Sequence, residues 1–504
     1  MTPAQRTSGY AFVVFLSSAI LLVLEVVAGR LIAPYVGMSL YTWTAIIGVI
    51  LAGLSLGNWI GGVWADRGAG ERETGHTLLA GALSCPLLLI VLHFVGVPIQ
   101  NSGVNLLGAS FLFVLALFFL PAVLLGVVTP LLTTLALRLD TRQGHVVGRM
   151  HALAALGSIL GTFLTGYVLV QWLGTRAIVL GCGVLLFLLA LPFLRATPRM
   201  LAATLLLAGA LGGGVWATRA HANPCMAESS YFCIRVVDKP GLTAQGRVRA
   251  LVLDHLVHGM NHDEQPALLV SPYVHLMAEM MQVTHGGRGP LNSFFAGGGA
   301  YTLPRGVAAL FPGSRVRVAE IDEAVTTAAA EKMFLDTAPL SIVHQDARWA
   351  LQHEPPASLD VVAADAFHDI AIPYHLTTRE FNRLVKSRLK PDGLYVLNVL
   401  DVFPNPLLAK SMLRTLREDF RQVSVWLDRV PREAARMTFV IAASDAHEWP
   451  RDLWSKQAPT RRWVRVDEPL SAAGTPLASL PVLTDDQVPV ERLVSSMLFG
   501  QHGL

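Results

Sequence analysis

Residues 292–299 (Asn-Ser-Phe-Phe-Ala-Gly-Gly-Gly) run from a short apolar segment directly into three glycines. The segment predicts a buried strand, and the glycines predict a loop whose backbone can approach a ligand closely, because glycine has no Cβ. Helical stretches separate it from three more apolar segments, each followed by an acidic residue: 315–319 before Glu320, 340–344 before Asp346, and 359–363 before Asp365. Strands that alternate with helices predict a parallel sheet with helices on both faces.

Further strands are predicted on both sides of this region. Segments 393–398 and 437–443 extend the predicted sheet, and segments 231–237 and 247–253 predict a β-hairpin that forms a small N-terminal sheet. The whole region therefore predicts an α/β Rossmann-like domain preceded by that small sheet.

Ligands of parallel α/β sheets bind outside the carboxyl ends of the strands, and the polar groups of this sequence lie at those ends. Gly297, Gly298 and Gly299 would admit a ligand. Glu320 could accept hydrogen bonds from both hydroxyls of a ribose, and Asp346 from an adenine amino group. The set predicts a nucleoside site, although each residue alone would also suit a turn or a helix cap.

Outside this domain the composition changes. The chain has 504 residues, of which 53% are hydrophobic and 15% charged, against about 25% charged in ordinary soluble domains. Most of the apolar excess lies before residue 220, which predicts a transmembrane bundle at 1–220 and a soluble domain at 221–504. A membrane-spanning helix needs roughly 20 apolar residues, and each apolar run has at least about that length. Seven such runs occur: 11–29, 42–64, 77–97, 106–137, 150–173, 177–194 and 200–218.

Two of these runs have alternative interpretations. The first follows Arg6 as a signal peptide would, but it is long and has no small-residue cleavage site before Arg30, which favours an anchor. The fourth contains Pro121 and Pro130, so it predicts either one kinked helix or a span followed by a re-entrant segment.

Two motifs within the bundle go beyond hydrophobicity. Glu25 lies inside the first run, where a carboxylate is either a functional group or half of a structural ion pair with a residue such as Arg30. Residues 61–67 (Gly-Gly-Val-Trp-Ala-Asp-Arg) resemble the loop between helices two and three of major-facilitator transporters.

Loop charges predict an orientation for the bundle. Seven arginines fall in the even-numbered loops and only Arg30 and Arg176 in the odd-numbered ones, which places the N-terminus in the cytoplasm. With seven spans, the soluble domain then lies on the non-cytoplasmic face. Cys225 and Cys233 could form a disulfide there, or remain two buried thiols.

Several motifs of the soluble half resemble the spermidine synthase (polyamine aminopropyltransferase) family, and the whole chain resembles its membrane-fused branch. The resemblance covers about residues 228–445 and the tail 483–491. The motifs that carry it are Leu253-Asp254 at the site entrance, 295–299 with 302–305 at the glycine loop, 319–322 at the ribose, 345–347 at the adenine, and 360–367 with Pro373, Leu376 and Glu380-Phe381 at the catalytic strand and gate loop.

The resemblance implies an enzyme that transfers an aminopropyl group from decarboxylated S-adenosylmethionine to a polyamine or another small cationic acceptor. Asp365 would be the general base that deprotonates the attacking amine. Ala347 and His258 would join the glycines, Glu320 and Asp346 at the donor. The acceptor side would be lined by Tyr273, His275, His368 and Asp369.

The sequence also departs from the family. Ala300 stands where the family has an aspartate that holds the donor's amino group, His258 replaces a glutamine, and His368 falls at the place of a second acid. Two alternatives stay open. Ala300 favours a methyltransferase that uses S-adenosylmethionine on a membrane-proximal substrate. Glu25 and the transporter-like loop favour a transporter or sensor of polyamines or nucleosides whose soluble half only binds.

The remaining expectations concern partners and location. A net charge of +3 without a basic tract predicts no nucleic-acid partner, and the Cys and His spacing predicts no metal site. The lipid bilayer is an expected partner, and a homodimer is one candidate assembly. The expected location is the plasma (inner) membrane. Loop charges put the soluble half outside the cytoplasm, whereas the family's activity puts it inside.

Overall fold

The computed structural model describes residues 2–100, 102, 104–194, 198–367, 370–458 and 460–499. The chain divides into two compact units, Met1–Ser230 and Tyr231–Leu504.

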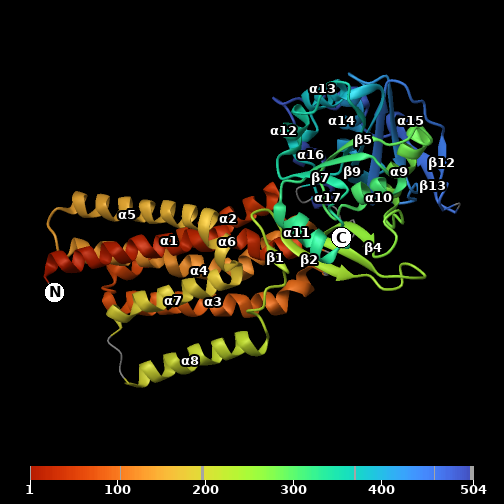
Figure 1. Cartoon of the computed structure of the whole chain (residues 1–504). Helices are drawn as coiled ribbons and strands as arrows, with labels where there is room; N and C mark the ends of the chain where they lie inside the picture. The colour runs from red at the N-terminus through yellow and green to blue at the C-terminus, as the bar shows by residue number, and fades with distance from the viewer. Residues whose placement is uncertain are drawn as a thin grey trace. The chain divides into compact units, whose positions relative to one another are not determined.

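The N-terminal unit is built from long apolar helices that run alongside one another (Figure 1). Its helices are α1 (Pro3–Val36), α2 (Leu40–Asp66), α3 (Glu71–Gln100), α4 (Leu106–Leu137), α5 (Gln143–Leu164), α6 (Val170–Leu173), α7 (Thr175–Ala190) and α8 (Pro198–Ala217), with a π-helical turn, η1 (Thr165–Leu169), between α5 and α6. Within the described residues, six helical segments are long and apolar enough to cross a membrane.

The helices bear on three predictions. The seventh predicted span, 200–218, coincides with α8, whose apolar part Ala202–Ala217 is shorter than the six long apolar segments. The fourth run forms the single helix α4 with both prolines inside it, and the first run is the helix α1 of the bundle.

Glycines allow the backbones of α2 and α4 to approach closely. Gly53, Gly57 and Gly61 recur every four residues on α2, and a Cβ atom at Gly61 would lie 2.6 Å from the carbonyl oxygen of Val127 on α4. Small residues at this spacing are typical of helix contacts in membranes, where van der Waals packing replaces the hydrophobic effect as the main attraction.

The C-terminal unit begins with a small antiparallel sheet. Strands β2 (Cys233–Asp238) and β3 (Val248–Leu253) form the predicted hairpin, and β4 (Leu256–His262) pairs with β3 as a strand that the sequence did not predict. β4 contains His258, Asn261 and His262 among its few apolar residues, so it lacks the usual strand pattern.

A nine-stranded sheet forms the core of this unit, in the order β12-β13-β10-β11-β9-β8-β5-β6-β7. The strands are β5 (Asn292–Ala296), β6 (Arg315–Ala319), β7 (Leu340–Val343), β8 (Leu359–Ala364), β9 (Leu389–Phe403), β10 (Gln422–Leu427), β11 (Ala435–Ser444), β12 (Asp452–Trp454) and β13 (Arg462–Arg465). β5 to β9 pair in parallel as predicted.

The rest of the sheet differs from the prediction. β11, predicted within a parallel sheet, pairs antiparallel with β9, and β10, β13 and β12 are also antiparallel. Only residues 428–434 connect β10 to β11, too few for the crossover that parallel strands require. The sheet is therefore mixed.

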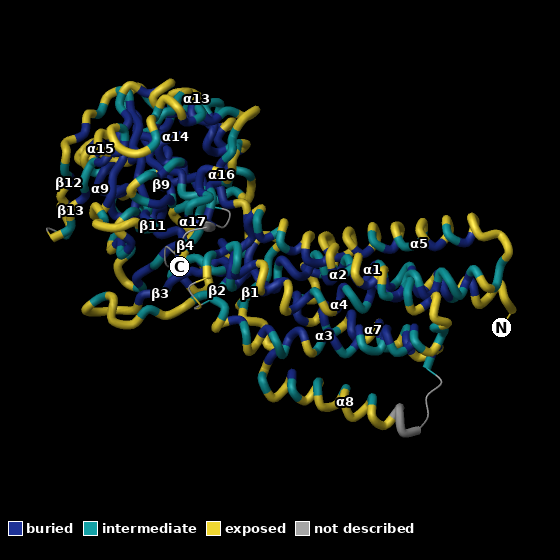
Figure 2. Tube along the Cα trace, turned by 180° about the vertical axis from the view of Figure 1, so that it is seen from behind, coloured by how far each residue is buried: buried dark blue, intermediate teal, exposed yellow. Residues whose placement is uncertain are grey.

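Helices follow most of the parallel strands. They are α9 (Pro272–His285), α10 (Thr302–Leu310), α11 (Glu323–Lys332), α12 (Ala347–Gln352), α13 (Arg379–Arg388) and α14 (Leu407–Leu416), with α15 (Asp467–Ala472), α16 (Val490–Leu493) and α17 (Ser495–Phe499) in the C-terminal segment. Figure 2 shows the strands of this unit buried and its outer helical turns exposed.

Candidate active site

The strand register brings the predicted site residues to one edge of the sheet. Gly297, Glu320 and Asp365 each directly follow an alanine at the end of β5, β6 or β8. Those alanines, Ala296, Ala319 and Ala364, pair with one another across the three strands. The three residues that the sequence separates by 23 and 45 positions therefore leave the sheet at the same level.

The glycine loop and Glu320 hold each other in place. The backbone N–H groups of Gly298 and Gly299 donate to Oε2 of Glu320 at 2.8 and 3.1 Å, and the N–H of Asp322 donates to Oε1 at 3.0 Å. Burial raises the pKa of Glu320, although these three donors oppose the shift. The carboxyl group is thus fixed against the loop.

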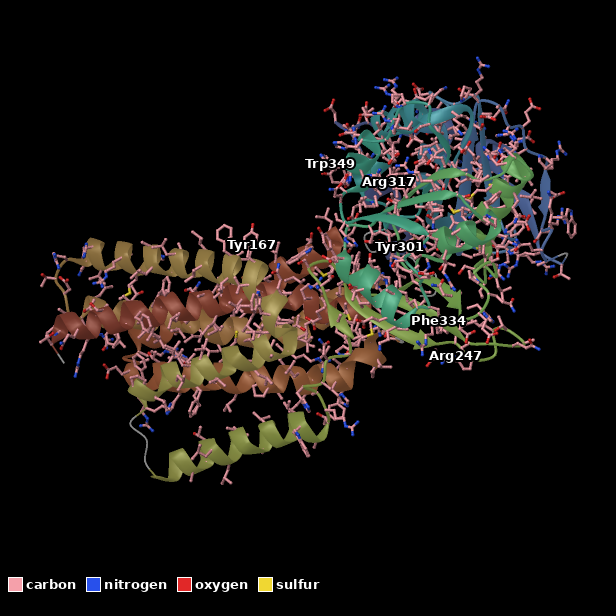
Figure 3. The ribbon with its side chains drawn as sticks, in the orientation of Figure 1. Tyr167, Arg247, Tyr301, Arg317, Phe334 and Trp349 are labelled. Atoms are coloured by element: carbon pink, nitrogen blue, oxygen red, sulfur yellow. The ribbon has the colours of Figure 1, made fainter. Side chains whose placement is uncertain are left out.

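At two of the glycines, the backbone conformation or a neighbouring residue leaves no room for a side chain. Gly297 has φ +95°, and a Cβ atom there would lie 2.5 Å from the carbonyl oxygen of Asp365. A Cβ atom at Gly298 would lie 2.6 Å from the ring of Tyr301, whose hydroxyl is 2.6 Å from that of Thr326 (Tyr301 is labelled in Figure 3).

Strand β4 packs against the same loop. Nδ2 of Asn261 donates to the carbonyl oxygen of Ala300 at 2.7 Å, and a Cβ atom at Gly259 would lie 2.6 Å from the Cβ of Ala300. The structure thereby brings His258 to the glycine loop, since its carbonyl oxygen would be 3.0 Å from a Cβ at Gly299. Burial lowers the pKa of the His258 imidazole to about 4.

Asp346 lies beyond β7, and its two oxygens have different partners. Oδ1 accepts from the backbone N–H groups of Arg348 and Trp349 and so caps α12, and Oδ2 is 2.6 Å from Nε2 of His375. The His375 imidazole is the main reason why the pKa of Asp346 is lowered. Ala347, the first residue of α12, is buried beside it.

The C-terminal tail reaches the same place. Arg348 forms a bidentate ion pair with Asp485, at 2.8 and 2.7 Å, and the backbone N–H of Arg379 donates to the carbonyl oxygen of Leu483. The tail motif 483–491 is therefore packed on the elements that carry Asp346.

Asp365 has the properties of a general base. The hydroxyl of Tyr273 is 3.3 Å from its Oδ2, and the side chain of Asn398 on β9 also hydrogen-bonds to it. Burial raises the pKa of Asp365 to about 6, against the opposing effect of those two hydrogen bonds. A carboxylate with a pKa close to neutrality can both accept and release a proton near physiological pH.

A cavity of about 190 Å³ continues from Tyr273 along the antiparallel side of the sheet. Strand pairing explains the place of the cavity. Asp365 and Asn398 directly follow Ala364 and Leu397, which pair across β8 and β9. Asn398 pairs with Val440 on β11, and Val440 pairs with Trp426 on β10. Its other lining residues include Leu276, Asp428, Arg429, Arg436, Met437, Thr438 and Trp463. It lies away from the glycine loop, which is reached across β8 and β5.

Not all predicted acceptor residues come together. His275 lies in a buried network of its own, in which Nδ1 accepts from Arg461 at 2.8 Å while Nε2 is 3.0 Å from Oγ of Ser455 and 3.3 Å from Glu279. His368 and Asp369 lie outside the described residues.

Sequence reasoning missed Asn398, His375 and the aromatic wall of the cavity. Asn398 is the one polar residue in an otherwise apolar stretch of β9, which is a signal that could have marked it. His375 lies in the gate-loop segment without a distinguishing pattern. Trp426 could not be assigned because β10 was not predicted.

Comparisons with known proteins agree with the motifs. No family model matches the chain. A probable polyamine aminopropyl transferase of Bifidobacterium longum is 26% identical over 238 residues, which are 42% of this chain and 50% of that protein. Polyamine aminopropyltransferase 2 of Pseudomonas aeruginosa is 27% identical over 216 residues, 40% of this chain and 58% of that protein. The chain thus spans about half the length of these curated relatives.

Solved structures include similar chains. A probable spermidine synthase of Corynebacterium glutamicum aligns with a TM-score of 0.43 and 24% identity, over 52% of this chain and 98% of that one. A spermidine synthase of Thermotoga maritima aligns with a TM-score of 0.35 and 20% identity, over 44% and 72%. The motifs and the curated relatives agree that the C-terminal unit is similar to polyamine aminopropyltransferases.

Proposed function

We propose that this protein is a membrane-bound aminopropyltransferase that moves the aminopropyl group of decarboxylated S-adenosylmethionine to a polyamine amine. The observation that carries the proposal is the position of Asp365, a half-buried carboxyl group with a pKa of about 6 that follows β8 between the glycine loop and the cavity beside Tyr273.

The donor site suits an adenosyl sulfonium compound. Glu320 would accept hydrogen bonds from the ribose hydroxyls, and Asp346 from the adenine amino group, for which it would have to share Oδ2 with His375. The glycines at 297–299 let the loop pack tightly against Asp365, Tyr301 and His258. Because they carry no side chains, they would also let a ligand approach the loop backbone closely from the other side. Carboxylates around the site also suit a cationic donor.

The chemical step needs one base. An aliphatic amine is protonated at neutral pH, so it must lose a proton before it attacks. The Asp365 carboxylate takes that proton, the nitrogen forms a bond to the aminopropyl carbon, and the carbon–sulfur bond breaks. The bond electrons stay on sulfur, which gives neutral methylthioadenosine. Tyr273 and Asn398 hold the carboxylate in position.

The acceptor would occupy the cavity beyond Tyr273. Tyr273 offers an aromatic ring to the cationic groups of a polyamine, and the exposed Asp428 adds a carboxylate beside Arg429 and Arg436. Trp426 and Trp463 also line the cavity, although both are fully buried. His258 at the loop is a further proposed contact to the donor. His275 would act indirectly, by holding α9, the helix that carries Tyr273, in position. A role for His368 or Asp369 rests on the sequence motif alone.

One observation favours a second function, methyl transfer from S-adenosylmethionine. Ala300 is fully buried under β4, so no carboxylate occupies the place where the related family holds the donor's amino group. The nucleoside product separates the two reactions. Incubation with each donor and mass spectrometry should give methylthioadenosine from an aminopropyltransferase, whereas S-adenosylhomocysteine and a methylated acceptor would support the alternative.

The membrane placement is a separate proposal. Six long apolar helices support a bilayer partner. The arginines of the even-numbered loops favour a C-terminal unit outside the cytoplasm, with α8 as an additional span. Cys225 and Cys233 are both disulfide-bonded, which suits an oxidising compartment. A compartment-sensitive reporter after Leu504 tests this: an exported reporter supports it, and a cytoplasmic reporter refutes it and fits a donor that cells make inside.

A further inference from the structure

A second cavity lies at one end of the N-terminal bundle, far in sequence from the residues discussed above. Its volume is about 310 Å³, and it lies between the first turns of α1 and the start of α5. Figure 1 shows the N-terminus of α1 and the beginning of α5 at the same end of the bundle. The polar residues that line it are Thr7, Ser8, Asp140, Arg142, His145 and Arg149.

The lining carries an excess of positive charge. Asp140 accepts from Nε and Nη2 of Arg142 at 3.3 and 3.1 Å, and this guanidinium holds the pKa of Asp140 below its usual value, so one acid is matched with one arginine. Arg149 donates to Oγ of Ser8 at 3.3 Å and has no acidic partner among the described lining residues. His145 lies between the two arginines on the same face of α5.

The cavity lies where an apolar outer surface begins. On α1, Phe12 is 57% exposed one turn after Ser8, and on α5 Leu156 and Phe163 are 54% and 57% exposed beyond Arg149. Tyr167 continues this exposed face at η1 (Figure 3), and Figure 2 shows the outer side of α5 as largely exposed. At 1.5 Å per residue, Leu156 is only about 10 Å from Arg149 along the helix.

From this arrangement we propose that the cavity binds the phosphate of an anionic phospholipid, whose acyl chains lie along the exposed apolar face of α5. Guanidinium groups bind phosphate oxygens through paired N–H donors, and basic pockets between membrane helices are suited to lipid headgroups. A lipid fits better than a free anion because the apolar surface continues directly from the basic cavity. The inference rests on the membrane placement of the bundle and not on the proposed transferase activity.

The test uses the full-length chain purified in non-ionic detergent and titrated with phosphatidylglycerol or phosphatidylcholine, with binding followed by native mass spectrometry. Replacing Arg142 or Arg149 by Gln should weaken phosphatidylglycerol binding about fivefold each, and about 25-fold together, while phosphatidylcholine binding stays unchanged. Arg149→Lys keeps the charge and should retain most of the affinity.

Arg72→Gln is the matched control, because Arg72 lies at the same end of the bundle but does not line the cavity. Its position follows from its neighbour Glu71 at the start of α3, which accepts a hydrogen bond from Tyr10 of α1. This variant should bind phosphatidylglycerol like the wild type. The proposal is overturned if the double variant keeps wild-type affinity, or if Arg72→Gln loses as much. Displacement of the lipid by millimolar inorganic phosphate would overturn the lipid assignment and identify a site for free anions.

Discussion

Replacing Gly297 with alanine should disrupt the contact between the glycine loop and the end of β8. The new Cβ would lie 2.5 Å from the carbonyl oxygen and 3.0 Å from the carbonyl carbon of Asp365, both of them backbone atoms that cannot rotate away. Either the loop or the end of β8 must therefore move, and the Asp365 carboxylate would move with it.

The magnitude has two parts. Alanine at a positive φ costs about 1–2 kcal/mol of unfolding free energy, and overpacking against backbone adds about 1–3 kcal/mol. Gly289 provides a control for the first part, because it has φ +93° and a Cβ atom there would meet no other atom within 4 Å. We expect Gly289→Ala to lose about 1–2 kcal/mol and Gly297→Ala about 2–5 kcal/mol.

The assay combines stability with activity. Urea unfolding of the detergent-solubilised chain, followed by tryptophan fluorescence, gives the two free energies. Methylthioadenosine release should fall about 100-fold in Gly297→Ala, because a displacement near 1 Å at a reacting group has effects of this order, and should change little in Gly289→Ala. Equal stability and equal activity of the two variants would refute the claim that the loop and Asp365 are held in contact.

Three other contacts lead to predictions of their own. Because Asp365 must be ionised to act as a base, kcat/KM should rise with pH through about 6. Tyr273→Phe removes a hydrogen bond that lowers the pKa of Asp365, so this rise should move to higher pH. An unchanged pH profile would contradict the contact between Tyr273 and Asp365. Glu320→Gln should weaken binding of the adenosyl donor in calorimetry by about 10–100-fold, unless Glu320 has no part in ribose binding. Gly61→Val should destabilise the bundle in thermal unfolding by about 1–3 kcal/mol. Gly62→Val should not, because a Cβ atom at Gly62 would meet no other atom within 4 Å.

Much of the site could be predicted because it depends on strand ends. A parallel sheet aligns the residues that follow its strands, so the glycines, Glu320 and Asp365 could be placed together from their spacing alone. The same logic placed Asp346 beyond β7. These positions depend on local sequence and on a topology with few alternatives.

The rest depends on contacts that a sequence pattern does not encode. The partner of Asp346, His375, comes from a loop 29 residues away, and His275 and Tyr273 are two residues apart on α9 and therefore point in different directions. The sequence pattern did not predict β10 and β13, so the cavity beside Tyr273 was not predicted either. Its aromatic wall comes from strands whose antiparallel pairing is set by the short connection between β10 and β11.

The most direct test of the proposed function is the release of methylthioadenosine by the full-length protein supplied with decarboxylated S-adenosylmethionine and a polyamine. The wild type should release it, and Asp365→Asn should lose about 10²–10⁴-fold in rate while still binding the donor. Asp336→Asn, an exposed carboxylate away from the strand ends, should behave like the wild type. A wild type without product, or an Asp365→Asn variant with undiminished turnover, would contradict the proposed function.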